Sequence, residues 1–215
     1  MRMVSVRLVT PMSQAVLNSD HVYEIGNAGQ LYWFADKVNK EFYGNANAVL
    51  TADIVVNKNV LNDGDLTKDV DGLRDWTPIQ QYGGTFDGAQ HTISGIYCVS
   101  DTIDEAGIFQ HTTDNAIVQN IGVLDSYYCL KEGCYVGGIV GHNSGIIRNC
   151  YNEGMVSSYI RQITIWVVSV EQMEVGPLQT VIIQERFPTL FGILGLVVYV
   201  VEILIRFLIA IIPDQ

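Results

Sequence analysis

Positive charge is scarce in this chain of 215 residues, which carries 12 lysines and arginines against 23 aspartates and glutamates. The formal net charge is -11 at pH 7. Nucleic-acid binding needs a basic face that displaces counterions from the phosphates, so this composition excludes a nucleic-acid partner. It also argues against an anionic membrane surface as the partner of the polar part of the chain. The ordinary consequence of such a charge is solubility, because acidic copies repel one another.

The chain also lacks the short motifs that mark common catalytic sites. It contains no G-x-S-x-G, no H-E-x-x-H and no phosphate-binding glycine loop. We therefore predict no catalytic residue and no cofactor, and the sequence favours a non-enzymatic role.

Cysteine is sparse, and the spacing of the cysteines differs from that of zinc-binding motifs. Cys129 and Cys134 are separated by four residues, wider than the C-x-x-C of zinc and redox sites, and His111 and His142 have no H-x-x-x-H partner. We therefore predict no metal ligands. The favoured interpretation is that the cysteines are small buried hydrophobes, with one disulfide as the alternative. The four cysteines are Cys98, Cys129, Cys134 and Cys150.

A secretory leader is not evident at the N-terminus. Arg2 could begin such a segment, but Arg7 and Pro11 interrupt the apolar stretch that would follow. We treat residues 1–21 as an N-terminal extension, and we expect either a different true start or a fragment of a longer protein.

The most informative stretch is residues 136–154, in which apolar pairs alternate with glycines and turn residues. A weaker copy lies about 30 residues upstream, a spacing typical of solenoids. In that copy residues 106–109 correspond to residues 136–140, and residues 114–120 correspond to residues 143–149.

Residues 27–39 predict a helix. Leu31, Phe34, Ala35 and Val38 follow the i, i+3, i+4, i+7 spacing of one apolar face. Asn27 is the predicted N-cap, and Gln30 completes a capping box. Such a helix is suited to covering the end of a stack of sheets, and docking of a partner is the alternative role.

Short strands and polar turns follow the helix. Residues 49–56 predict a strand, and residues 57–75 a polar loop with several aspartates. Calcium binding by these carboxylates is the less favoured alternative, because the EF-hand register fails. Residues 76–79 and 84–97 predict further short strands, with a tight turn at Asp87 and Gly88 and a break at Gly95.

Short strands separated by glycine turns predict coils of sheet that stack on one another. No coil buries its apolar face alone, so neighbouring coils support each other and the ends need caps. Asn120 and Asn149 hold equivalent places in the repeat, and we predict that their side chains form a ladder.

Composition changes near residue 157, and residues 157–215 form an apolar C-terminal segment. Residues 163–175 and 181–183 predict a hairpin. Residues 189–212 are long enough to cross a bilayer, and Glu202 and Arg206 could pair on one helix face. The alternatives are a buried helix that caps the solenoid and a non-native tail.

The ordered motifs of residues 22–156 resemble the GLUG-motif repeat proteins of anaerobic bacteria. The resemblance is carried by L-T-A-D-I at residues 50–54, W-T-P-I at 76–79, G-T-F-D-G at 84–88 and G-G-I-V-G at 137–141. It implies a right-handed parallel β-helix, on a secreted or surface-attached protein, and it supplies no catalytic residues. The departures are that the chain has only one good repeat, Gln110 stands where the repeat has Gly141, and nothing after residue 157 matches.

Three functions compete. The first, which we favour, is a non-catalytic surface module for adhesion or display, with a host or cell-wall glycan or a protein as partner. The second is a carbohydrate-active or carbohydrate-binding β-helix, in which Asp87 and His91 act on the sugar and Trp76, Tyr82 and Tyr97 stack on it. For Asp87 and His91 we favour structural roles. The third is an accessory fragment of a large secreted peptidase.

Overall fold

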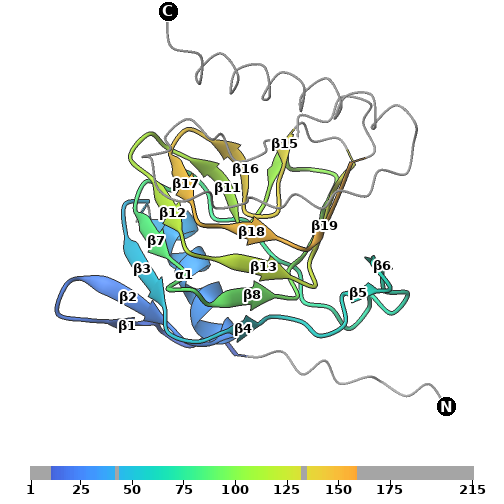
Figure 1. Cartoon of the computed structure of the whole chain (residues 1–215), viewed down its shortest axis with the longest axis horizontal. Helices are drawn as coiled ribbons and strands as arrows, with labels where there is room; N and C mark the ends of the chain where they lie inside the picture. The colour runs from blue at the N-terminus through green and yellow to red at the C-terminus, as the bar shows by residue number, and fades with distance from the viewer. Residues whose placement is uncertain (1–10, 42–43, 132–134, 159–215) are drawn as a thin grey trace, which may run out of the picture. The chain divides into compact units, whose positions relative to one another are not determined.

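The chain is represented by a computed structural model that describes residues 11–41, 44–131 and 135–158 (Figure 1). Over these residues the protein is mainly β, with one helix and many short strands. The predicted boundary near residue 157 stays a prediction. The predicted C-terminal hairpin and the apolar segment 189–212 lie outside the described residues. No helix among the described residues is long and apolar enough to cross a membrane.

The N-terminal elements form one edge of the largest sheet. Strand β1 (Val16–Leu17) pairs antiparallel with β2 (Val22–Ile25). Strand β2 is followed by helix α1 (Ala28–Glu41) and then by β3 (Asn47–Leu50), which pairs parallel with β2. Helix α1 is therefore the crossover between two parallel neighbours, and Figure 1 shows it behind the sheet.

The predicted capping box of α1 is confirmed. Oδ1 of Asn27 accepts a hydrogen bond from the backbone N–H of Gln30 at 3.0 Å. Oε1 of Gln30 accepts one from the backbone N–H of Gly26 at 2.8 Å. The two side chains thus satisfy the backbone N–H of Gln30 in the first helical turn and that of Gly26, which precedes the N-cap. The helix extends two residues beyond the predicted end, to Glu41.

The predicted apolar face of α1 is also confirmed, because Leu31, Phe34, Ala35 and Val38 are all buried. The Phe34 ring lies 6.3 Å from the Tyr82 ring and 6.1 Å from the Phe86 ring, so the helix packs onto aromatic side chains of the strands that follow. On its polar side, Asp36 and Glu41 pair with lysines four residues away. The helix therefore covers the core at the N-terminal end of the stack.

After β3 and β4 (Ile54–Val55), the chain makes three passes that repeat the same order of strands. The first pass contains β7 (Thr85–Asp87), β8 (Thr92–Ser94) and β9 (Tyr97–Ser100). The second contains β10 (Glu105–Ala106), β11 (Phe109–Thr112), β12 (Ile117–Gln119), β13 (Gly122–Leu124) and β14 (Tyr127–Leu130). The third contains β15 (Tyr135–Val136), β16 (Val140–Asn143), β17 (Ile146–Arg148), β18 (Tyr151–Asn152) and β19 (Met155–Ser158).

Each strand pairs in parallel with the corresponding strand of the next pass. The rows are β3-β7-β12-β17, β4-β8-β13-β18, β9-β14-β19, β10-β15 and β11-β16, and the first two are visible as stacked arrows in Figure 1. The stacked coils predicted from the repeat are therefore present as parallel ladders. Antiparallel pairing among the described residues is confined to β1 with β2 and to β5 (Leu61–Asn62) with β6 (Asp65–Leu66).

In-register pairing stacks apolar side chains into continuous rows inside the coils. Ala48, Phe86, Val118 and Ile147 form one such row across four strands. Phe86 and Val118 are fully buried. Burying such a side chain is worth about 1.5 to 3 kcal/mol, and each pass gains it only when a neighbouring pass covers it.

Two predicted strands need correction. Residues 49–56 are two elements, because β3 ends at Leu50 and β4 (Ile54–Val55) begins after a bend. The chain turns a corner there, since β3 pairs with β7 whereas β4 pairs with β8. Residues 76–79 form no strand, and only Ile79 makes an isolated bridge, to Phe109.

The turn after β7 also differs from the prediction. Positive φ angles occur at Ala89 and Gln90, at 49° and 70°, rather than at Gly88. Glycine is required at Gly88 for another reason: a Cβ there would lie 2.3 Å from the carbonyl oxygen of Asn120. The predicted role of Gly95 is correct, because its φ is +80°.

Candidate functional site

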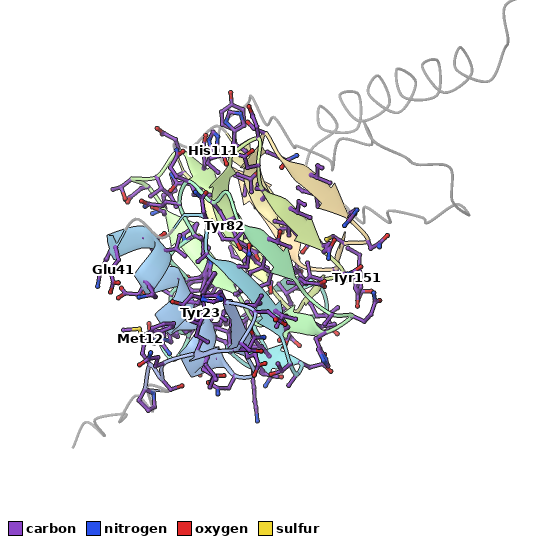
Figure 2. The ribbon with its side chains drawn as sticks, turned by 90° about the vertical axis from the view of Figure 1, so that its left-hand side faces the viewer. Met12, Tyr23, Glu41, Tyr82, His111 and Tyr151 are labelled. Carbon is purple, nitrogen blue, oxygen red and sulfur yellow. The ribbon has the colours of Figure 1, made fainter. Side chains whose placement is uncertain are left out.

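Three residues of metal-binding types meet on the second and third passes. Glu105 lies on β10, His111 on β11 and His142 on β16. The register of β11 and β16 pairs His111 directly with His142, so the two imidazoles are neighbours on one ladder. Strand β10 precedes β11 in the same coil and brings Glu105 beside both rings. In Figure 2 His111 is labelled at the top of the stack of coils, far from Met12.

The Glu105 carboxylate faces both imidazole rings. Its Oε1 lies 3.0 Å from Nδ1 of His142, and its Oε2 lies 3.7 Å from Nδ1 of His111. The centroids of the two rings are 4.5 Å apart, and the Tyr135 ring lies 5.0 Å from His142 on the other side. The three side chains are 17% to 32% exposed, so solvent reaches the cluster.

This arrangement allows two kinds of chemistry. Without an ion, the Glu105 carboxylate is hydrogen-bonded to the His142 ring of the next coil and lies within ion-pair distance of His111. With an ion, two imidazole nitrogens and a carboxylate oxygen are a ligand set that Zn²⁺ uses in proteins. Among the residues that the structure describes, this is the group of three or more such side chains close enough to share an ion.

Sequence reasoning predicted no metal ligands and missed this cluster, although the repeat contained part of the signal. The aligned copies place Gln110 against Gly141, and the next residues are His111 and His142. In a parallel in-register ladder these two must be neighbours. The contribution of Glu105 depends on the path of the chain between β10 and β11, which the alignment does not specify.

The structure does not join Asp87 and His91 into a catalytic pair. Asp87 accepts hydrogen bonds from the amides of Asn120 and Gln119, at 3.0 and 2.6 Å, and from the backbone N–H of Ala89 at 2.8 Å. Burial alone would raise the pKa of Asp87, but these hydrogen bonds lower it below its usual value. The predicted structural role of Asp87 in the turn is confirmed.

His91 has a different partner. Its Nδ1 lies 3.3 Å from Oδ1 of Asp53, which also accepts a hydrogen bond from the backbone N–H of Thr92 at 2.9 Å. The hydrogen bond from Thr92 is the main reason that the pKa of Asp53 is lowered. The His91 ring thus has a side-chain partner, as the structural role predicted for it requires.

Two of the three aromatic residues suggested for sugar stacking lie in the core, and that suggestion is wrong for them. Trp76 is 3% exposed, and its indole N–H donates to the carbonyl of Gly107 at 3.1 Å. Tyr82 is fully buried, and its hydroxyl donates to the carbonyl of Ala46 at 2.8 Å. Tyr97 is half-buried and stacks on Tyr127 with ring centroids 6.4 Å apart.

The cysteines that the structure describes are unpaired. Cys98, Cys129 and Cys150 are buried and form no disulfide with one another. This agrees with the interpretation of cysteine as a small core residue, while Cys134 lies outside the described residues. Burial raises the pKa of the Cys98 thiol to about 12 and that of Cys150 to about 11. Such thiols are poor nucleophiles at neutral pH.

The polar segment of residues 57–75 is held in place rather than freely solvated. It contains a small hairpin of β5 (Leu61–Asn62) and β6 (Asp65–Leu66). The Asp125 carboxylate accepts hydrogen bonds from the backbone N–H groups of Val60 and Leu61, at 3.2 and 2.7 Å. The aspartates of this segment, considered above as calcium ligands, form no group of three close enough to share an ion within the described residues.

The comparison with protein families supports the GLUG resemblance over one segment. Residues 132–157 match a family model described as the GLUG motif. This range contains β15 to β18 and therefore His142, whereas Glu105 and His111 lie upstream of it. No curated protein and no solved structure matches the chain.

Proposed function

We propose that this chain is a non-catalytic right-handed parallel β-helix module, secreted or attached to the cell surface, that serves adhesion or display. The observation that supports this most is the use of polar side chains in the repeat. Asp87, Asn120 and Asn149 form a hydrogen-bonded row from one coil to the next, with 3.0 Å at each step. Asp87, the member of this row for which a catalytic role was considered, thus contributes to the stacking of the coils.

The right-handed assignment follows from a general property of parallel strands. Successive strands of each row are parallel and are joined by a full pass of the chain. Crossovers between parallel strands of one sheet are right-handed in about 98% of cases, because strand twist favours that hand. The GLUG motif in the third pass is compatible with this architecture.

The surface role rests on the acidic charge, the stacked coils and the apolar segment 189–212. We propose that this segment holds the module at a membrane and that its partner is a host or cell-wall glycan or a protein. The test is protease treatment of intact cells that produce the full chain, followed by alkaline extraction. We expect cleavage within residues 22–156 from outside and retention of the tail in the membrane pellet. Cleavage only after lysis would contradict the proposal.

Carbohydrate binding is the second candidate, and the Tyr97–Tyr127 stack favours it. The two rings are inclined by 21° and lie half-buried on neighbouring strands, and partly exposed aromatic rings can pack on sugar rings. Binding of the full chain to immobilised glycans should fall in Tyr97→Ala and Tyr127→Ala. The matched control is Tyr151→Ala, on a different row of strands, and equal binding by all three variants would reject this candidate.

A further inference from the structure

We propose that Glu105, His111 and His142 form a site for a divalent transition-metal ion of the Zn²⁺ class, which connects the second and third coils. Glu105 and His111 belong to one coil and His142 to the next. A shared ion would therefore cross-link adjacent coils in addition to the strand hydrogen bonds. This inference is independent of the adhesion or display role.

The spacing of the ligand atoms supports the assignment. With metal–nitrogen and metal–oxygen bonds of about 2.0 to 2.2 Å, tetrahedral geometry places ligand atoms roughly 3.3 to 3.6 Å apart. The Glu105 oxygens lie 3.0 Å from His142 Nδ1 and 3.7 Å from His111 Nδ1. One ligand atom from each residue can be chosen so that all three lie within 4.8 Å of one another. Small rotations of the side chains would bring the three donors around one ion.

The surroundings also suit an ion. The ladder fixes the backbones of His111 and His142, and their rings already lie against each other and against Glu105, so binding an ion orders little more of the chain. Partial exposure leaves an entry path and room for water as a fourth ligand. Imidazole nitrogen and carboxylate oxygen favour Zn²⁺ and similar transition metals over Ca²⁺, which prefers six to eight oxygens.

The test is a titration of the purified, chelator-treated full chain with ZnCl₂, followed by calorimetry and by thermal unfolding. We expect one Zn²⁺ per chain and a rise in Tm of about 5 to 10 °C when free Zn²⁺ is 100-fold above Kd. EDTA should reverse the rise. Absence of binding, or binding without any rise in Tm, would overturn the proposal.

Substitutions locate the site. His111→Asn, His142→Asn and Glu105→Gln should each weaken binding by more than about 100-fold, beyond the range for outer-shell partners of a metal. His91→Asn is the matched control, because His91 also faces a single carboxylate but lies outside the cluster. Retention of wild-type affinity in all three cluster variants would place the ion elsewhere and reject the site.

A spectroscopic measurement on the unmodified chain keeps the test decisive if a variant fails to fold. Co²⁺ bound by imidazole and carboxylate shows d–d absorption without a thiolate charge-transfer band. We expect that spectrum, because the ligand set of the cluster contains no sulfur. A thiolate charge-transfer band would assign the ion to cysteines and overturn the proposal.

Discussion

Asparagine at the corners of the coils combines a left-handed backbone conformation with a side-chain hydrogen bond between coils. Asn120 and Asn149 have φ angles of 55° and 53°, in the left-handed region that most side chains avoid. Their side chains are also linked, because Asn149 donates to Asn120 at 3.0 Å. The ladder predicted from the repeat is therefore confirmed, and Asp87 extends it by one coil.

Replacing Asn149 with leucine should remove both the residue that tolerates the left-handed conformation and the hydrogen bond to Asn120. The left-handed conformation costs a branched side chain about 1 to 2 kcal/mol, and the lost hydrogen bond about 1 kcal/mol more. We expect the free energy of unfolding to fall by about 2 kcal/mol, measured by urea denaturation. Asn149→Gly keeps the backbone conformation and should lose at most about 1 kcal/mol. An unchanged unfolding midpoint in Asn149→Leu would reject the role of the ladder.

Two fully buried tyrosines provide a second comparison at the scale of single residues. The hydroxyl of Tyr82 donates to Ala46, whereas the hydroxyl of Tyr128 has no hydrogen-bond partner among the described atoms. The Ser126 hydroxyl lies near Tyr128 and partly offsets the effect of burial on the pKa of Tyr128, but it donates its own hydrogen bond to the carbonyl of Leu124. Burial raises the pKa of both tyrosines, so both remain neutral.

The two hydroxyls should therefore respond differently to removal. Tyr82→Phe leaves the carbonyl of Ala46 without this donor and should cost about 1 to 2 kcal/mol. Tyr128→Phe removes an unsatisfied polar group and should leave the free energy of unfolding unchanged or raise it by up to about 1 kcal/mol. Chemical denaturation of the two variants side by side checks this. An equal loss in both would show that Tyr128 has a bonded partner such as a buried water.

At the scale of elements, the polar segment of residues 57–75 is held in part by a side chain far along the sequence. Asp125, at the corner between β13 and β14, holds the backbone of Val60 and Leu61. The segment has little apolar contact of its own, apart from the buried residues Val60 and Leu73. Asp125 therefore holds the part of the segment around Val60 and Leu61, whereas Asn57 and the Tyr32 hydroxyl hold Arg74 and Asp75 at its end.

Asp125→Ala should release this segment without unfolding the coils. We expect trypsin to cleave at Lys58 and Lys68 at least several-fold faster in the variant, because local opening exposes the backbone to the protease. Asp125→Asn is the control, since asparagine tolerates the φ of 43° at this position and retains a carbonyl acceptor. Equal cleavage rates in Asp125→Ala and the parent chain would show that the Asp125 carboxylate does not hold this segment.

At the scale of the whole molecule, stability should depend on alkaline pH through the buried thiols. The folded-state pKa values of Cys98 and Cys150 are about 12 and about 11, whereas an unfolded cysteine has a pKa of about 8.5. The stability that the protonated thiols contribute is complete below pH 8.5. It is lost as pH rises toward the folded-state values, because the unfolded chain releases protons that the folded chain retains.

Between pH 8.5 and pH 10 the free energy of unfolding should therefore fall by about 2 to 4 kcal/mol, at up to about 1.4 kcal/mol per pH unit for each thiol. Urea denaturation in reducing buffer at several pH values measures this. A variant with Cys98→Ala and Cys150→Ala should show a flatter dependence, whatever its absolute stability. An equally steep dependence in the variant would assign the effect to other groups.

Much of the fold could be read from the sequence because it depends on local signals. The capping box at Asn27, the apolar face of α1 and the turns after short apolar runs involve residues close together in the chain. The spacing of about 30 residues between repeat copies predicted the stacking of coils, and the GLUG motif matches residues 132–157. The prediction of one strand over residues 49–56 was wrong, because a corner of the coil divides these residues into β3 and β4.

The sequence by itself thus determined the helix at the N-terminal end, the stacked short strands and the pairing of Asn120 with Asn149. The tertiary structure decided which side chains share a surface and which lie inside the coils. In the folded chain Trp76 and Tyr82 are buried, and Glu105, His111 and His142 lie next to one another. The physical reason is that these placements depend on pairing register and corner geometry over many residues, whereas caps, turns and periodicity depend on neighbours in the chain.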